Sequence, residues 1–131
     1  MPSTTSIRSN EGLFSLPTTE DRMAELPRAP AIHRTFVTRY PKLGAAWDLI
    51  AEAGAAGPLD DTTQRLVKLG IAIGAMREGA VHSSVRKALA QGVPAEALDQ
   101  VVALAAGTLG MPSCVAAFSW VREVVEKQDV T

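Results

Sequence analysis

Two side chains that can exchange protons lie four residues apart in this sequence, in a segment that should form a helix. Glu78 and His82 have the spacing that brings residues onto one helical face. On a helical projection, Glu78 falls within the apolar stripe of its segment and His82 falls at the edge of that stripe. A carboxyl group in a dry environment has a raised pKa, and a neighbouring imidazole can exchange a proton with it. The pair therefore predicts an acid/base site with His82 and Glu78 as its catalytic residues.

Simpler roles for these two residues remain open at this point. Glu78 can stabilise the start of a helix through the helix dipole, and His82 can form a hydrogen bond at an interface. A metal site is disfavoured, because two ligands do not fill a zinc shell and the sequence indicates no third ligand. The other histidine, His33, is expected to be solvated. We therefore expect neither a metal nor a cofactor.

Arginines near this segment are candidates for binding a negatively charged substrate. Arg86 follows His82 by one helical turn, and a guanidinium binds a carboxylate through two parallel hydrogen bonds. An arginine on a helix surface is the commoner alternative for Arg86. Arg65 lies on a mostly apolar segment, where it is either an anion anchor or an ion-pair partner of Glu78.

Composition limits the class of protein. The chain has 131 residues, which is the size of one domain, and a net charge of −1, which gives no case for a nucleic-acid partner. Hydrophobic residues make up 47% but aromatic residues only 5%, so the core must consist of Ala, Val, Leu and Ile. A single cysteine, Cys114, excludes an internal disulfide and is expected to be an inert buried thiol. No apolar run reaches membrane-spanning length, and we expect a soluble, cytoplasmic protein with no membrane partner.

The first 39 residues differ from the rest of the chain. Ser, Thr, Pro and charged residues dominate them, which predicts a partly irregular N-terminal arm over residues 1–39. Within this arm, one short helix is expected after Thr18 and another after Pro30.

From residue 40 to residue 127, apolar residues recur at helical spacing and no strand pattern occurs. The segment 61–76 is apolar on most sides, so we expect it to be the most buried helix, with Asp61 as its N-cap and Gln64 completing a capping box. Gly92 is suited to end the helix of His82. The sequence predicts an all-α fold, a compact bundle of about six helices, with 40–127 as its helical domain.

Several spaced motifs between residues 40 and 126 together resemble the carboxymuconolactone decarboxylase family, whose fold is shared with alkylhydroperoxidase-type proteins. The resemblance implies a functional site on the helix of His82 and assembly into trimers or hexamers. The motifs are the segment from Leu59 to Leu69, the segment Glu78–Leu89 with Gly92, and the corner Gly107–Pro112.

The chain departs from the peroxidase-type pattern of this family. Their C-x-x-C-x-x-x-H pattern would place cysteines on Arg77 and Ala80 and a histidine on Ser84, and their relay glutamate would fall on Arg65. Thiol peroxidase chemistry needs a thiolate and a resolving thiol. The resemblance therefore implies a subgroup without the CxxC motif. Decarboxylase-type members keep a histidine at the position of Ser84, which is followed here by the family's Val-Arg pair.

These observations favour a cofactor-free acid/base enzyme, a decarboxylase, lyase or isomerase, that acts on a small carboxylated or carbonyl substrate. Arg86, Arg65 and Ser84 are expected to bind this substrate, and His82 and Glu78 to move the proton. The alternative is a non-catalytic protein on the same scaffold, either a small-ligand-binding module or an assembly protein. In either case we expect a homo-oligomer, because one helical chain with so many Ala, Val and Leu residues cannot cover all its apolar faces.

Overall fold

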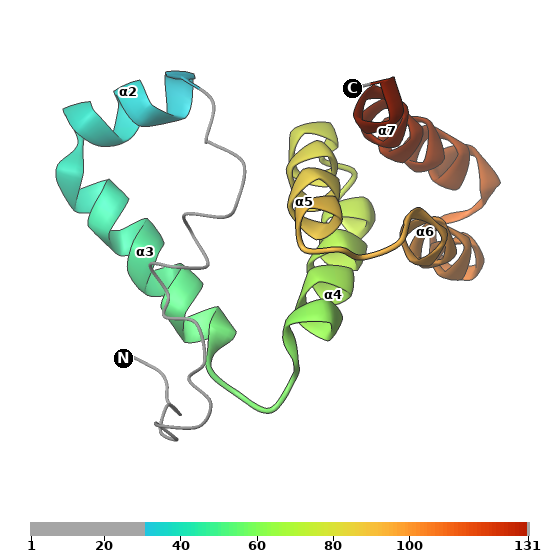
Figure 1. The fold of residues 1–131 in the computed structure, drawn as a ribbon, viewed down its shortest axis with the longest axis horizontal. Coiled ribbons are helices and arrows are strands. Elements are labelled where there is room, and N and C mark those ends of the chain that lie inside the picture. The colour runs from blue at the N-terminus through green and yellow to red at the C-terminus, as the bar shows by residue number, and fades with distance from the viewer. Residues whose placement is uncertain (1–30, 131) are drawn as a thin grey trace. The chain divides into compact units, whose positions relative to one another are not determined.

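The structure, a computed structural model, describes residues 31–130, and the helix expected after Thr18 lies outside the described residues. Within the described part all regular secondary structure is helical, which confirms the all-α prediction of about six helices (Figure 1). The helices are α2 (Ala31–Arg39), α3 (Pro41–Ala55), α4 (Asp61–Gly74), α5 (Glu78–Ala90), α6 (Ala95–Leu109) and α7 (Met111–Val130).

The chain divides into two units, one up to Pro58 and one from Leu59 onward. The first contains α2, which is the helix expected after Pro30, and α3. Gly44 lets these two helices approach closely, because a Cβ atom at this position would lie 3.1 Å from the Cβ of Val37. The predicted division into an arm over 1–39 and a helical domain over 40–127 stays a prediction.

The second unit is built from α4, α5, α6 and α7. Both α5 and α6 pack against α4 on one side and α7 on the other, so the four helices surround one core (Figure 1). This core is aliphatic, as the composition predicts. Cys114 is buried there, as expected, and its thiol donates to the carbonyl oxygen of Val102 at 3.5 Å. The largest fully buried side chains are Leu69, Ile73, Val81, Val85, Leu98 and Val121.

Helix α4 is not buried on most sides within the protomer, and that prediction is wrong. Leu69 and Ile73 have no exposed surface, but Val67 and Ile71 are 46% and 66% exposed. The two pairs lie on different faces of the helix, and only one face of α4 meets α5 and α6. The largest share of buried core residues comes instead from α7.

The N-terminus of α4 is capped one residue earlier than predicted. Asp60, not Asp61, is the N-cap, and its Oδ1 accepts a hydrogen bond of 2.7 Å from the backbone N–H of Thr63. Gln64 does not complete a capping box, since its amide donates to the carbonyl of Leu59 at 2.7 Å. The hydrogen bonds from Thr63, the backbone bond first, hold the pKa of Asp60 below its ordinary value of 3.8.

Asp60→Asn is expected to lower the melting temperature at pH 7 and to make a smaller difference at pH 3. Because the carboxyl pKa is depressed in the folded state, its contribution is present above pH 3.8 and is lost as pH falls through the folded value. Asparagine keeps a side-chain acceptor at the cap but cannot titrate. Thermal unfolding of both proteins at the two pH values measures this difference, and an equal gap at both would contradict it.

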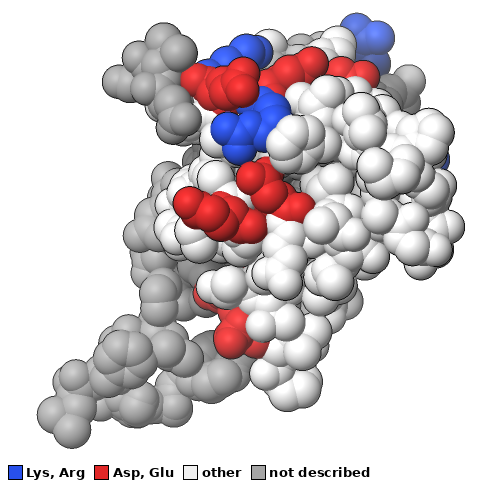
Figure 2. Space-filling model, turned by 90° about the vertical axis from the view of Figure 1, so that its right-hand side faces the viewer, with Lys and Arg blue, Asp and Glu red and all other residues white. Residues whose placement is uncertain are grey.

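Large apolar side chains on α6 and α7 remain uncovered in the protomer. Leu104 is 73% exposed, Met111 66%, Val115 58% and Phe118 44%. In the face shown by Figure 2, charged side chains gather toward the top and left, while uncharged side chains cover most of the right-hand side. The trimer or hexamer that the family resemblance implies stays a prediction. No helix within residues 31–130 is long and apolar enough to cross a bilayer.

Candidate functional site

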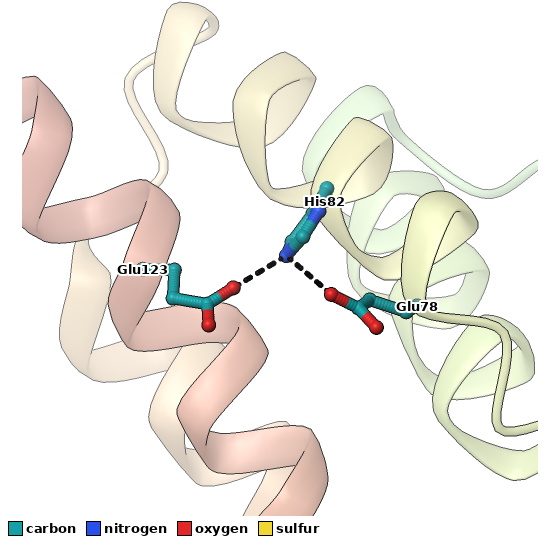
Figure 3. A group of neighbouring side chains, drawn as sticks. All are labelled: Glu78, His82 and Glu123. Carbon is teal, nitrogen blue, oxygen red and sulfur yellow. Dashed lines mark hydrogen bonds and ion pairs between the residues drawn. The ribbon is translucent and has the colours of Figure 1, made fainter.

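Helix α5 carries the predicted acid/base pair and is fixed by its buried side. Val81 and Val85 are fully buried against the core, and the helix ends before Gly92, whose φ of 87° is the left-handed conformation that glycine favours. This confirms the expected stop at Gly92. With the valines turned inward, His82 lies at the edge of the packed face and reaches toward α7 (Figure 3).

Two carboxylate side chains converge on the imidazole of His82. Its Nε2 atom lies 2.9 Å from Oε1 of Glu123 on α7 and 3.9 Å from Oε2 of Glu78 on α5. Both carboxylates point toward the same ring nitrogen (Figure 3). The side chain of His82 is 25% exposed, whereas those of Glu78 and Glu123 are 56% and 55% exposed. We call these three residues the Glu–His–Glu group.

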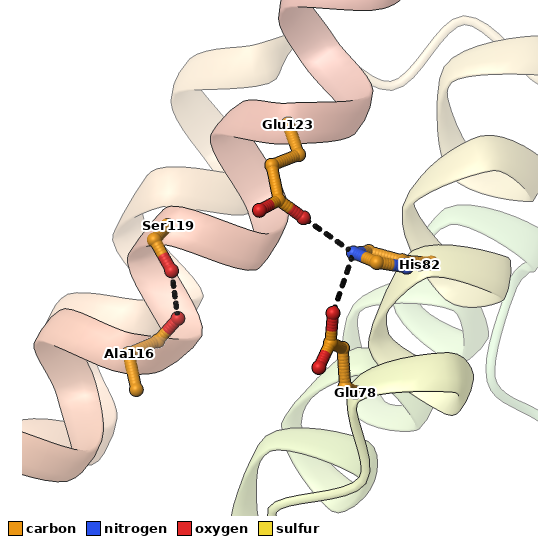
Figure 4. A network of polar contacts seen from close by, with 5 residues as sticks. All are labelled: Glu78, His82, Ala116, Ser119 and Glu123. Atoms are coloured by element: carbon orange, nitrogen blue, oxygen red, sulfur yellow. Dashed lines mark hydrogen bonds and ion pairs between the residues drawn. The ribbon is translucent and has the colours of Figure 1, made fainter.

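The chemistry of the two groups indicates which of them donates the short hydrogen bond. An ionised carboxylate can only accept, so Nε2 of His82 carries the proton and donates it to Glu123. Ser119, one turn before Glu123, does not take part, because its hydroxyl donates to the carbonyl of Ala116 at 2.6 Å (Figure 4). The imidazole proton is therefore held between two carboxylates at a solvent-accessible position.

Glu78 does not lie in the dry environment that its place in the apolar stripe predicts. More than half of its side-chain surface is exposed, so the expected burial of this carboxyl is wrong for the protomer. Glu78 is the first residue of α5 and directly follows the turn after α4, so it lies at the end of the helix and not in its packed middle. Glu78 is nevertheless brought close to His82, as the four-residue spacing predicts.

A small pocket of about 130 Å³ opens beside the histidine. Arg86, predicted to bind substrate, lines it together with Lys127, so two cations and a proton donor face one space. Ordinary ligand pockets measure roughly 300–1,000 Å³, so this one holds only a small compound or part of a larger one. The complete lining is His82, Arg86, Glu123, Val124, Lys127 and Gln128.

The other two residues predicted to bind substrate are not part of this pocket. Nε of Arg65 donates to Oε1 of Gln91 at 3.1 Å, and within the described residues Arg65 forms no ion pair with Glu78. Arg65 was expected to be either an anion anchor or an ion-pair partner of Glu78, and the ion pair is not formed. Ser84 lies on a different side of α5 from His82, since their helical positions are roughly 160° apart.

Glu123 is the member of the Glu–His–Glu group that the sequence did not predict. It follows His82 by 41 residues and comes from a different helix, so no local spacing connects the two. A signal was present: Glu123 is a charged residue in a run where Val121, Val124 and Val125 are all buried. An acid at the border of a packed face can reach a side chain of the neighbouring helix, and here it reaches His82.

Glu123 also supplies a third possible metal ligand. The sequence indicated no such ligand, and a metal site was disfavoured for that reason. One ligand atom from each member of the Glu–His–Glu group lies within 4.8 Å of the others, and this is the one such set found in the described part of the chain. Two carboxylates and an imidazole are ligands that zinc accepts. These three residues could hold a metal, and any test of the site must therefore include a chelator.

Comparison with known proteins gives one match. No curated protein and no solved structure matches the chain. Residues 41–123, more than half of the sequence, match the carboxymuconolactone decarboxylase family. The matched range contains α3 to α6 and the part of α7 that ends at Glu123, and so includes the whole Glu–His–Glu group. The chain belongs to the carboxymuconolactone decarboxylase family.

Proposed function

We propose that the protein is a cofactor-free acid/base enzyme, of the decarboxylase, lyase or isomerase type, that acts on a small carboxylated or carbonyl compound. The observation that carries this proposal is the 2.9 Å contact between His82 and Glu123 beside a pocket lined by Arg86. Family membership suggests a decarboxylase-like or an alkylhydroperoxidase-like activity. The second is disfavoured, because thiol peroxidase chemistry needs two thiols and the chain has only the buried Cys114.

In the proposed reaction, Arg86 and Lys127 bind a carboxylate or carbonyl oxygen of the substrate. The imidazolium form of His82 transfers one of its two ring protons to the substrate carbon and is left as neutral imidazole, while Glu123 positions the ring through its contact with Nε2. In a decarboxylation, the bond from carbon to the carboxylate breaks and carbon dioxide leaves. The electron pair stays on the carbon, which takes the proton from His82, and a proton from water restores the imidazolium.

The alternative is a non-catalytic module that binds an apolar ligand. The polar lining of the pocket disfavours this alternative. Charged and polar side chains make up nearly all of the lining, and Val124 is its single apolar member. Such a space favours a small charged compound over an apolar one. We also propose that a second copy of the chain completes the site, because the small pocket of the protomer leaves most of a substrate uncovered.

Glu123→Gln tests the role of the carboxylate in turnover of carboxymuconolactone, followed by release of carbon dioxide. The change keeps the size of the side chain but removes its charge, so we expect kcat to fall by about 10- to 100-fold with little change in KM. Glu126→Gln is the matched control. It changes an exposed carboxylate on the same helix, 3.8 Å from Arg122 and outside the pocket, and should leave turnover as it is.

The same assay in the presence of a chelator distinguishes acid/base from metal chemistry. Full activity after removal of divalent ions supports the proposal, because no step then depends on a metal held by the Glu–His–Glu group. Loss of activity on chelation, with recovery on adding zinc, would replace the cofactor-free mechanism by a metal-assisted one. An equal kcat for Glu123→Gln and the unaltered protein would contradict a role in turnover for the contact between His82 and Glu123.

A further inference from the structure

Three cations lie on the α4–α5 helix pair, outside the lining of the pocket beside His82. We call Arg65, Lys68 and Lys87 the cationic cluster. The bond from Arg65 to Gln91 places the first part of α4 beside the last part of α5. The two helices are joined by a short turn and pack side by side, so they run in opposite directions (Figure 1).

This arrangement brings like charges together across the helix pair. One turn inward from the contact of Arg65 and Gln91, the chain presents Lys68 on α4 and Lys87 on α5. Partial burial lowers the pKa of both lysines, and the charge of Arg65 lowers each of them further. The charges of Lys68 and Arg86 also lower the pKa of Lys87. The contact between Arg65 and Gln91 and the packing of α4 on α5 place these cations near one another, and the directions of the pKa shifts agree with this placement.

Neither Lys68 nor Lys87 forms an ion pair within the described residues. One acid acts on the cluster: burial lowers the pKa of Arg65, and the charge of Asp61 offsets this only in part. Like charges on neighbouring helical positions destabilise a fold by amounts similar to those that opposite charges contribute. The chain therefore carries an electrostatic cost at one defined place, and a bound anion would offset it.

We propose that the cationic cluster is a binding site for a small oxyanion with two negative charges, such as phosphate. Lysine ammonium groups bind phosphate as point charges, and a guanidinium offers paired donors to oxygen atoms. Arg65 uses its Nε–H for Gln91, which fixes the side chain and leaves the donors at the end of the guanidinium for a ligand. Arg65 and Lys68 are three residues apart on α4, a rise of about 4.5 Å along the helix, and Lys87 comes from the neighbouring helix α5.

This site is separate from the one proposed for turnover. Arg65 and both lysines lie outside the lining of the pocket beside His82. The phosphate site is argued from the arrangement of the charges and not from the proposed reaction. Its test measures anion binding, so the phosphate site and the proposed reaction can each be disproved separately. It also gives Arg65 the anion-binding role that the sequence left open.

The test is a pair of measurements on the full chain and on Lys68→Met/Lys87→Met, a variant that keeps the apolar stems and removes the charges. Without phosphate and at low ionic strength, we expect the variant to melt at a higher temperature than the unaltered protein, because the repulsion is gone. With inorganic phosphate, we expect a saturable rise in melting temperature for the unaltered protein and none for the variant. In calorimetric titrations, the double variant should bind phosphate about tenfold more weakly than the unaltered protein, or weaker still.

Sodium chloride at equal ionic strength separates binding from screening, and succinate compares a dicarboxylate with phosphate. Lys42→Met, which removes an exposed cation on α3, is the matched control and should keep the full response to phosphate. An equal rise in sodium chloride, or an unchanged response in the double variant, would overturn the proposal. A change in oligomer mass in the double variant, with phosphate binding unaffected, would show instead that the cluster meets an acidic surface of a second copy.

Discussion

His82→Ala is expected to lower the turnover of carboxymuconolactone, or of another small acid that the enzyme accepts, by about 10²- to 10⁴-fold. Removing the imidazole removes the proposed proton donor, whose Nε2 lies 2.9 Å from Oε1 of Glu123 and which lines the pocket. The fold should persist, because His82 lies at the edge of the core and Val81 and Val85 hold α5 in place. Steady-state kinetics, together with circular dichroism of the variant, measure both expectations.

Cys114→Ser is the control that separates acid/base from thiol chemistry. The serine hydroxyl can make the hydrogen bond that the thiol makes to the carbonyl of Val102, so the fold is preserved. We expect turnover to change hardly at all. If Cys114→Ser abolished activity while His82→Ala kept it, the site on α5 would not be the active site.

Leu69→Ala is expected to cost about 2–5 kcal/mol of unfolding free energy, the usual range for removing a buried leucine side chain. Leu69 has no exposed surface and lies where α4 packs against α5 and α6. This loss is a large fraction of the roughly 5–15 kcal/mol that stabilises an ordinary domain. Urea unfolding should show a lower midpoint with an unchanged slope.

Thr62→Ala provides the comparison on the same helix. Thr62 is exposed in the first turn of α4, and a substitution there should stay within about 0.5 kcal/mol. A Leu69→Ala protein as stable as Thr62→Ala would mean that α4 does not contribute to the core as described. The ratio of the two effects, rather than either value alone, tests the packing of this helix.

The helices were predictable because their signals are local. Apolar spacing, Pro41 at a helix start and glycine at helix ends are properties of short segments, and the observed bounds follow them closely. The cap of α4 was misplaced by one residue, because Asp60 and Asp61 are both good caps and only the backbone conformation decides between them. The exposure of Val67 and Ile71 was not predictable, since it depends on which neighbours a single chain provides.

The candidate site was predictable only in part, for a related reason. The spacing of Glu78 and His82 places both on one helical face, and the structure brings them within 3.9 Å. The burial of Glu78 could not be inferred from its helix alone, because burial depends on what packs against that helix. Glu123 and the separation of Arg65 from the pocket are outcomes of tertiary packing, which brings α7 to one side of α5 and α4 to another.

The dependence of His82 on Glu123 has a consequence for the order of events during synthesis. The histidine leaves the ribosome 41 residues before its carboxylate partner does. Val121, Val124 and Val125, which flank Glu123, also complete the core at the same late stage. A nascent chain that has made α4, α5 and α6 therefore lacks both the closed core and the carboxylate partner of His82. Both are supplied by the last helix, α7.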